Sequence, residues 1–153
     1  MRKLIVVPIT CVLFVGGFGA PGGADDKEDA IKADMKLLQG VWLMQSFESN
    51  GNPLPAEQAQ KIKVTVKGDK YMVDLGERKF EATFTIDPTK KPKAIDVTMT
   101  LNEEKAVTLG IYEVSKNAFK ICRTMEAGAE RPKEFSTKEG SGTVLAVYKR
   151  EQK

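Results

Sequence analysis

The stretch KIKVTVKGDKYMVDLGERKFEATFTID, residues 61–87, decides the fold class of this chain. Apolar and polar side chains alternate along it with a period of two, and Gly68-Asp69 and Gly76-Glu77 interrupt the alternation. Such alternation is typical of β-strands with one buried and one solvated face, and short glycine-containing turns join them into antiparallel hairpins. The stretch therefore predicts three strands of an antiparallel meander.

The same rhythm continues on both sides of this stretch. We expect eight strands, at residues 41–49, 62–67, 71–75, 80–87, 95–101, 106–114, 118–124 and 143–150. Eight antiparallel strands with near-neighbour connections form a closed barrel or a two-sheet sandwich, and the barrel leaves no exposed edge. We predict an all-β fold, an eight-stranded antiparallel up-and-down barrel with a short N-terminal helix. The sandwich remains the alternative.

The helix is predicted just before the first strand. Ile31, Met35 and Leu38 recur at the spacing of one helical face, and Gly40 follows where a helix would stop. The spacing predicts a helix over residues 28–38. We expect it to act as a lid or plug against one end of the barrel.

The first 24 residues have the features of a secretory signal peptide. Arg2 and Lys3 precede an apolar run at residues 4–15, and Gly22 and Ala24 supply small residues before a cleavage point. We predict a signal peptide over 1–24, a single domain over 25–153, and export to the periplasm or the extracellular space. The apolar run is short for a membrane span, so none is expected after cleavage, although an uncleaved anchor stays open.

The composition limits the kinds of metal site and catalytic site that the chain can form. The sequence has no histidine, and Cys122 is the one cysteine of the segment 25–153. Because histidine is the commonest general base and metal ligand, we expect no metal site, no cofactor and no histidine-based catalysis. Most carboxylates fall in turns or at outward strand positions, so we predict that the protein is not an enzyme. An enzyme that uses two carboxylates facing each other in a pocket is the alternative. A formal charge of +3 predicts no nucleic-acid partner.

Arg123 and a lysine-rich turn each allow two interpretations, a structural one and a binding one. Arg123 should point inward near a barrel end, where a guanidinium requires either a structural partner or a ligand. Lys90, Lys91 and Lys93 lie in a proline-containing turn between two predicted strands. That turn is either a solvated loop or a weak contact for an anionic polymer of the cell envelope.

The layout resembles the lipocalin superfamily in the broad sense. Gly40-Val41-Trp42 follows the predicted helix at the start of the first strand, and Arg150 follows the last strand. The resemblance implies that Trp42 closes the barrel floor and that Arg150 packs over its ring, with Gly40 at the same place as a structural residue. A guanidinium over an indole contributes about 0.5–2 kcal/mol.

A second resemblance covers most of residues 36–150. The fragments are LQGVW, NGNPLP, KGDKY, DPTKKPKAID, LGIYEV, FKIC, RPKEF and GSGTVLAVYKR, in this order. Together they resemble an uncharacterised paralogous domain family of planctomycete bacteria. That resemblance implies export of the domain, and it brings no established activity or functional residue to this sequence.

The inward positions suggest what the barrel holds. We predict non-enzymatic binding of a small apolar or amphipathic ligand, with Trp42, Phe84, Met99, Tyr112 and Arg123 as the ligand-binding residues. Phe80 is also predicted to point into the barrel, because the alternation places it on the same face of its strand as Phe84. The alternative is a filled core, in which case the protein is a structural or protein-interaction module of the cell envelope with an envelope protein as partner.

Overall fold

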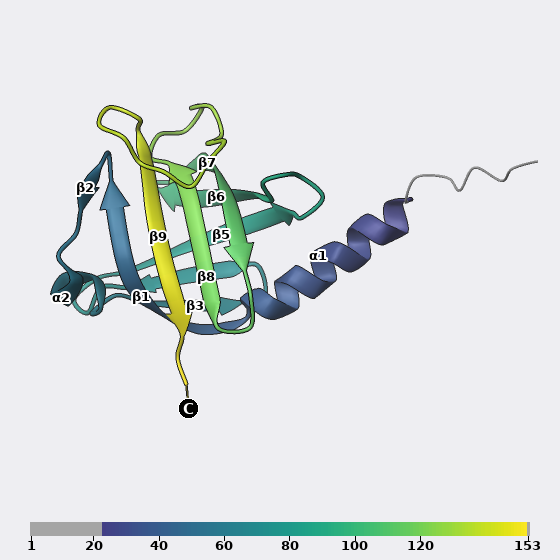
Figure 1. Ribbon diagram of the computed structural model, residues 1–153, viewed down its shortest axis with the longest axis horizontal. Coiled ribbons are helices and arrows are strands. Elements are labelled where there is room, and N and C mark those ends of the chain that lie inside the picture. The colour runs from purple at the N-terminus through teal and green to yellow at the C-terminus, as the bar shows by residue number, and fades with distance from the viewer. Residues whose placement is uncertain (1–22, 153) are drawn as a thin grey trace, which may run out of the picture.

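The computed structural model describes residues 23–152 of the chain. The predicted signal peptide therefore lies almost entirely outside the described residues. Two helices and nine strands form the described part (Figure 1). In chain order they are α1 (Ala24–Leu38), β1 (Gly40–Ser49), β2 (Asn52–Pro53), α2 (Ala56–Ala59), β3 (Lys63–Lys67), β4 (Lys70–Asp74), β5 (Lys79–Asp87), β6 (Ala94–Leu101), β7 (Glu104–Val114), β8 (Ala118–Thr124) and β9 (Thr143–Arg150).

Eight of the strands close into a barrel. From β3 to β9 each strand pairs antiparallel with the next, and β1 pairs with both β3 and β9. The closing ladder runs from Trp42 opposite Arg150 to Ser49 opposite Val144, with a bulge between Met44 and Ser46. The predicted eight-stranded antiparallel barrel is confirmed. The sandwich alternative is wrong, because the first and last strands are hydrogen-bonded along most of their length.

The structure adds short elements to the sequence-based expectation, namely α2, β2 and the first residues of α1. The ninth strand, β2, pairs with the end of β1 across Asn50 and Gly51, whose φ angles of 49° and 80° suit a two-residue hairpin turn. Helix α1 begins four residues before the predicted start, because Asp25 and Asp26 occupy its first turn and their charges complement the helix dipole.

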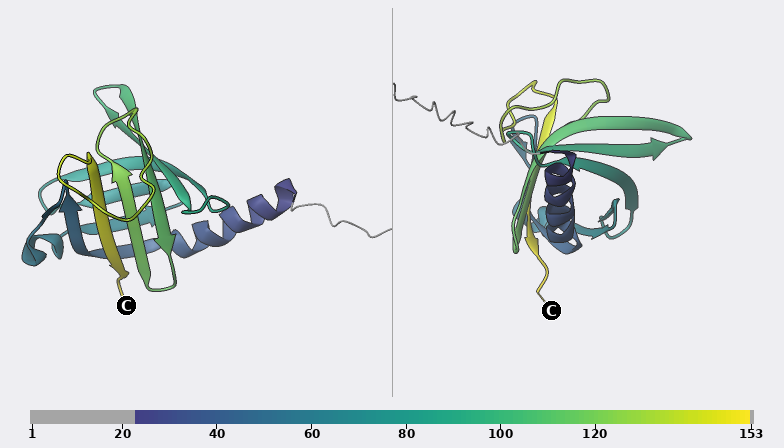
Figure 2. Two further views of the ribbon diagram at one scale, coloured as in Figure 1. Left: turned by 45° about the horizontal axis from the view of Figure 1, so that its top comes forward. Right: turned by 90° about the vertical axis from the view of Figure 1, so that its right-hand side faces the viewer.

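One end of the barrel is filled with large side chains. Trp42, Tyr112 and Phe119 are each at most 1% exposed, and Leu38 at the end of α1 joins the same cluster. The Trp42 and Phe119 rings lie 5.7 Å apart in a tilted arrangement, and Phe119 stacks on Tyr148 at 5.3 Å. We call this the closed end. The opposite end carries the tip of the β6–β7 hairpin, which projects from the barrel (Figure 2).

Asp34 fastens the helix to the closed end. Its Oδ2 accepts hydrogen bonds from the Tyr112 hydroxyl and from the Lys93 ammonium, both at 2.7 Å. Asp34 is 7% exposed, so the carboxylate is largely removed from water and depends on these two donors. Burial, followed by the neighbouring Asp34, raises the pKa of Tyr112 well above its ordinary value, so the phenol keeps its proton. The last turns of α1 thus act as the predicted plug.

Replacing Tyr112 with phenylalanine is expected to lower the free energy of unfolding by about 1–2 kcal/mol, because Asp34 loses one of its two donors. Urea unfolding followed by circular dichroism measures the change. Glu28→Gln is the control, since it breaks only the exposed pair with Lys32 on the same helix and should leave the midpoint unmoved. A Tyr112→Phe midpoint equal to that of the unaltered protein would contradict the proposed anchoring role.

Candidate functional site: a cavity in the open half of the barrel

The half of the barrel opposite Trp42 is hollow. It holds a cavity of about 300 Å³, which we call the inner cavity, and this volume lies at the lower end of the range for small-molecule sites. Small side chains leave the space, since Ala82 on β5 and Ala146 on β9 line it. The remaining lining is Met44, Phe47, Leu54, Ile62, Tyr71, Val73, Leu75, Phe80, Glu81, Met99, Ile121, Arg123, Val144 and Tyr148.

Two of the five predicted ligand-binding residues line the inner cavity, namely Met99 and Arg123. Trp42 and Phe84 face the barrel interior but lie deeper, in the packed cluster. Tyr112 also faces inward, yet its hydroxyl is used by Asp34. These three side chains face the barrel interior but do not line the inner cavity. Alternation could not show this difference, because it gives the face of a strand and not the position along the barrel axis.

Phe80 lies at the rim rather than in the core. It lines the inner cavity but remains 45% exposed, and Leu75 across the β4–β5 turn is 41% exposed. Both side chains face the hollow end, where no layer of residues covers them. The mouth of the cavity is therefore apolar and open to solvent.

Sequence reasoning missed a pair of tyrosines in the inner cavity. The hydroxyl oxygens of Tyr71 on β4 and Tyr148 on β9 lie 2.7 Å apart. The signal was present, because both residues occupy inward positions of their strands. However, β4 and β9 are not neighbours in the sheet, so only the closed three-dimensional barrel reveals that the two hydroxyls meet.

The tyrosines are uncharged hydrogen-bonding groups at neutral pH. Burial raises the pKa of Tyr71 and that of Tyr148, while the positive charge of Arg123 acts in the opposite direction on both. Burial is the largest cause in each case. The inner cavity therefore presents two neutral phenols and one guanidinium on an otherwise mainly apolar wall.

The expected contact of Arg150 with Trp42 is present at the barrel floor. The Arg150 guanidinium carbon lies 4.1 Å from the centre of the Trp42 ring, and the Trp42 Nε1 donates a hydrogen bond of 2.8 Å to the Leu38 carbonyl. Gly40 has a φ of 115°, and a Cβ there would lie 2.8 Å from Arg150 Nη1. Glycine at this position thus leaves the arginine the space it occupies.

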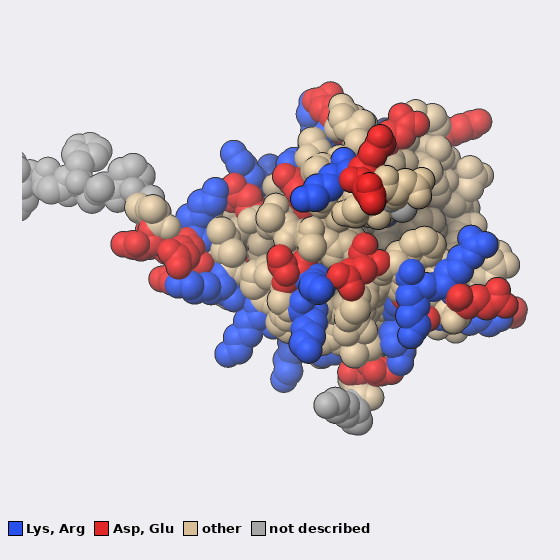
Figure 3. Space-filling model, turned by 180° about the vertical axis from the view of Figure 1, so that it is seen from behind, with Lys and Arg blue, Asp and Glu red and all other residues tan. Residues whose placement is uncertain are grey.

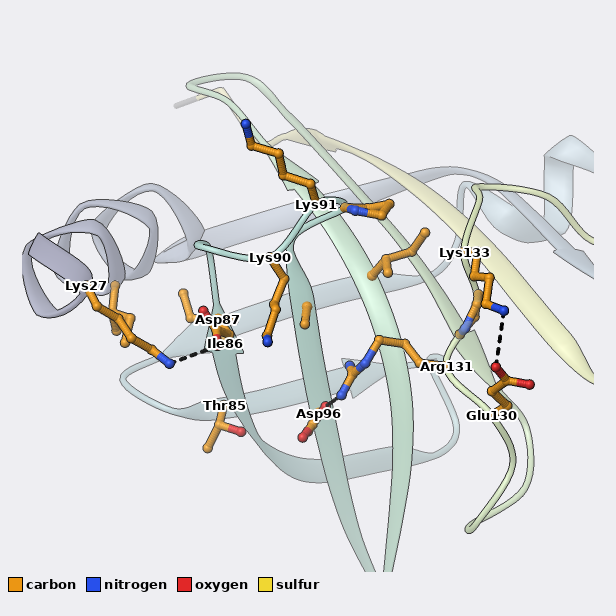
Figure 4. A pocket seen from close by; sticks show the side chains of 15 residues that line it. Lys27, Thr85, Ile86, Asp87, Lys90, Lys91, Asp96, Glu130, Arg131 and Lys133 are labelled. Atoms are coloured by element: carbon orange, nitrogen blue, oxygen red, sulfur yellow. Dashed lines mark hydrogen bonds and ion pairs between the residues drawn. The ribbon is translucent and has the colours of Figure 1, made fainter. Parts of the chain in front are cut away.

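A second hollow lies outside the barrel, and we call it the outer groove (Figure 4). It has a volume of about 650 Å³ between the start of α1, the outer faces of β5–β7 and the segment 130–133. Ion pairs join Lys27 to Asp87, Arg131 to Asp96 and Lys133 to Glu130 along its walls. Arg131 also donates to the carbonyls of Ile95 and Gly110, so this arginine has a structural role.

Cys122 is buried on the outer side of β8 beneath the long segment 125–142. Its thiol donates to the Ser136 carbonyl at 3.6 Å, and burial, the largest cause, raises its pKa. Because the thiolate is the reactive form, we expect slow alkylation in the folded protein. In a Cys11→Ser variant, iodoacetamide at pH 8 should modify Cys122 at least about tenfold faster after unfolding in urea. Equal rates in both states would contradict this description.

Metal ligation, membrane-spanning helices and surface charge indicate no further candidate site among the described residues. No group of three or more Cys, Asp or Glu residues among them is arranged to hold a metal ion. Within 23–152, no helix has the length and apolarity needed to cross a membrane. On the face seen in Figure 3, Lys and Arg are interspersed with Asp and Glu rather than gathered in one area of a single sign.

The fold and the inner cavity define the class of this protein as a closed antiparallel β-barrel with a hollow, mostly apolar end. Comparisons with protein-family models, with curated proteins and with solved structures found no match. The functional argument therefore rests on the geometry of this chain.

Proposed function

We propose that the protein is an exported, non-enzymatic binding protein that holds one small amphipathic molecule in the inner cavity. The observation that carries the proposal is an apolar hollow of about 300 Å³ inside a barrel whose other end is packed solid. Ligand sites have this character, since they are concave and mainly apolar with a few placed polar groups. A chain that needed only a stable core would gain by filling the hollow.

Native mass spectrometry of the protein purified from its own cell envelope tests the proposal. We expect a complex with one small molecule that is lost on denaturation. Ala82→Leu should reduce the bound fraction at least about tenfold, because the larger side chain occupies part of a small cavity. Thr83→Val, on the outward face of the same strand, is the matched control and should retain the ligand. Retention by Ala82→Leu at the wild-type level would contradict binding in the inner cavity.

Export is the second part of the proposal. The features that support it are the basic start, the apolar run and the small residues around position 24 of the sequence. Fractionation should recover the protein outside the cytoplasm, and N-terminal sequencing of the purified protein should begin at Asp25. Recovery of an intact N-terminus in the cytoplasm would overturn export and leave the binding proposal untouched.

The outer groove favours a second candidate function, docking of an acidic segment of an envelope protein. Lys90 extends into the groove (Figure 4), and no described carboxylate forms an ion pair with it. Ile31, Ala94 and Ile111 line the groove beside it, although Ala94 and Ile111 are almost fully buried. Lys90→Glu should release the protein from its envelope fraction at low salt, whereas Lys149→Glu on β9 should not. Equal release of the two variants would remove this candidate.

A further inference from the structure

Arg123 enters the inner cavity from β8. It alternates with Phe119 and Ile121, which are 1% and 3% exposed and face the barrel interior. Across the sheet it lies opposite Gly110 on β7, and a Cβ on Gly110 would come within 2.8 Å of the Arg123 Cβ. The missing side chain at Gly110 therefore gives the arginine stem room inside the barrel.

The charge of Arg123 has no counter-charge in the described part of the chain. No carboxylate lies within ion-pair distance of it, and Glu81, the one acidic residue of the cavity wall, pairs with Lys70. The guanidinium has two long hydrogen bonds through Nη1, of 3.4 Å to the Thr108 hydroxyl and 3.3 Å to the Thr124 carbonyl. A partly buried guanidinium with five N–H donors is left with most of them unused.

The other two partly buried arginines are different. Arg131 has a carboxylate at 2.7 Å and two carbonyl acceptors, and Arg150 has three carbonyl acceptors and an indole ring. Both are therefore accounted for by the fold. Arg123 has fewer protein partners than these two, and its unused N–H groups are accessible to a partner from outside the chain.

The tyrosine pair also offers a donor. Each phenol has one O–H, and in the contact between Tyr71 and Tyr148 one hydroxyl donates to the other. The accepting hydroxyl keeps its own proton, which has no acceptor among the described residues. Arg123 and this hydroxyl together make a polar set that consists of donors, so the matching group on a ligand is an acceptor, and the guanidinium favours a negative one.

We propose that the inner cavity selects a monoanionic amphiphile, with its carboxylate on Arg123 and the free tyrosine hydroxyl and its hydrocarbon part against Phe47, Val73 and Met99. This inference rests on the proposed function, because it names the ligand class of the same cavity. A small volume of about 300 Å³ restricts the ligand to a short hydrocarbon part.

Three probes with one chain length test the inference by isothermal titration calorimetry on the folded protein: octanoate, 1-octanol and octylammonium at pH 7.5. We expect octanoate to bind at least about tenfold more tightly than octanol, which is the ratio of one charge-assisted contact. Octylammonium should bind more weakly than octanol, because its charge repels Arg123. These three titrations on the unaltered protein decide the question even where variants fold poorly.

Substitutions at Arg123 test whether the preference for octanoate over octanol depends on this residue. Arg123→Gln should remove the preference for octanoate over octanol while octanol affinity stays within about threefold. Arg123→Lys keeps the charge and should keep part of the preference. Lys120→Gln is the matched control, since it removes one positive charge from the outward face of the same strand and should leave all three affinities unchanged.

The outcomes separate the inference from the proposed function. Equal binding of octanoate and octanol, or an unaltered preference in a folded Arg123→Gln variant, would overturn the anionic ligand class and leave a ligand-binding barrel. Absence of binding by all three probes at millimolar concentration would overturn both. A preference for octanoate that Arg123→Gln removes supports both.

Discussion

Replacing Trp42 with alanine is expected to lower the free energy of unfolding by about 3–5 kcal/mol. Trp42 is fully buried, and it contacts Phe119, Arg150 and the end of α1. The substitution leaves a cavity in the closed end and removes the donor that the Leu38 carbonyl uses. Since Trp42 is the one tryptophan of the chain, unfolding in urea must be followed by far-ultraviolet circular dichroism rather than by intrinsic indole fluorescence.

Trp42→Phe separates the ring from its hydrogen bond. It keeps an aromatic side chain beside Phe119 but loses the Nε1 donor and part of the volume, so we expect a smaller loss of about 1–3 kcal/mol. Phe80→Ala at the rim of the inner cavity is a size-matched control, because that ring is already 45% exposed. If Trp42→Ala and the unaltered protein unfolded at the same urea concentration, the closed end would not depend on the indole.

The fold could be predicted largely from the sequence, because both of its signals are local. Alternation along residues 61–87 identifies which side chains face inward, and glycine turns such as Gly68 identify where strands reverse. The sequence left two architectures open, a closed barrel and a two-sheet sandwich. Closure of the barrel depends on the ladder between β1 and β9, which joins residues about a hundred positions apart and leaves no local signal.

The inner cavity could not be predicted in the same way. Whether a barrel interior is filled depends on the summed volumes of side chains at one depth, and depth follows from strand tilt and stagger rather than from alternation. The closed end brings Trp42, Tyr112 and Phe119 to one level, whereas the open end brings Ala82 and Ala146 together. Any one of these residues, taken alone, is compatible with a filled or a hollow barrel.

The role of each partly buried arginine could not be predicted from its local sequence either. Arg123, Arg131 and Arg150 are all partly buried, and their sequence neighbours do not distinguish them. The carbonyls and the carboxylate that account for Arg131 and Arg150 come from other elements of the chain. Only after these partners were known could Arg123 be recognised as the arginine of these three with the fewest protein partners.

Replacing Arg150 with alanine is expected to cost about 2–3 kcal/mol, from the cation–π contact and from charged hydrogen bonds at a partly exposed site. Its guanidinium donates to the carbonyls of Leu37, Gln39 and Lys116 at 2.5, 2.6 and 2.5 Å. These acceptors belong to the end of α1 and to the β7–β8 turn, so one side chain holds both against the floor. Hydrogen exchange should therefore accelerate in α1 as well as near β9.

Arg150→Lys tests whether the planar fork or the charge alone stabilises the floor. Lysine keeps the charge above Trp42 but its single nitrogen cannot span three carbonyls in the same geometry, so we expect at least half of the loss to remain. A cycle that combines Arg150→Ala with Trp42→Leu isolates the ring contact, and its coupling energy should be about 1 kcal/mol. An Arg150→Lys protein as stable as the unaltered one would assign the stabilisation to charge, and the carbonyl contacts would then be consequences of the floor geometry rather than its cause.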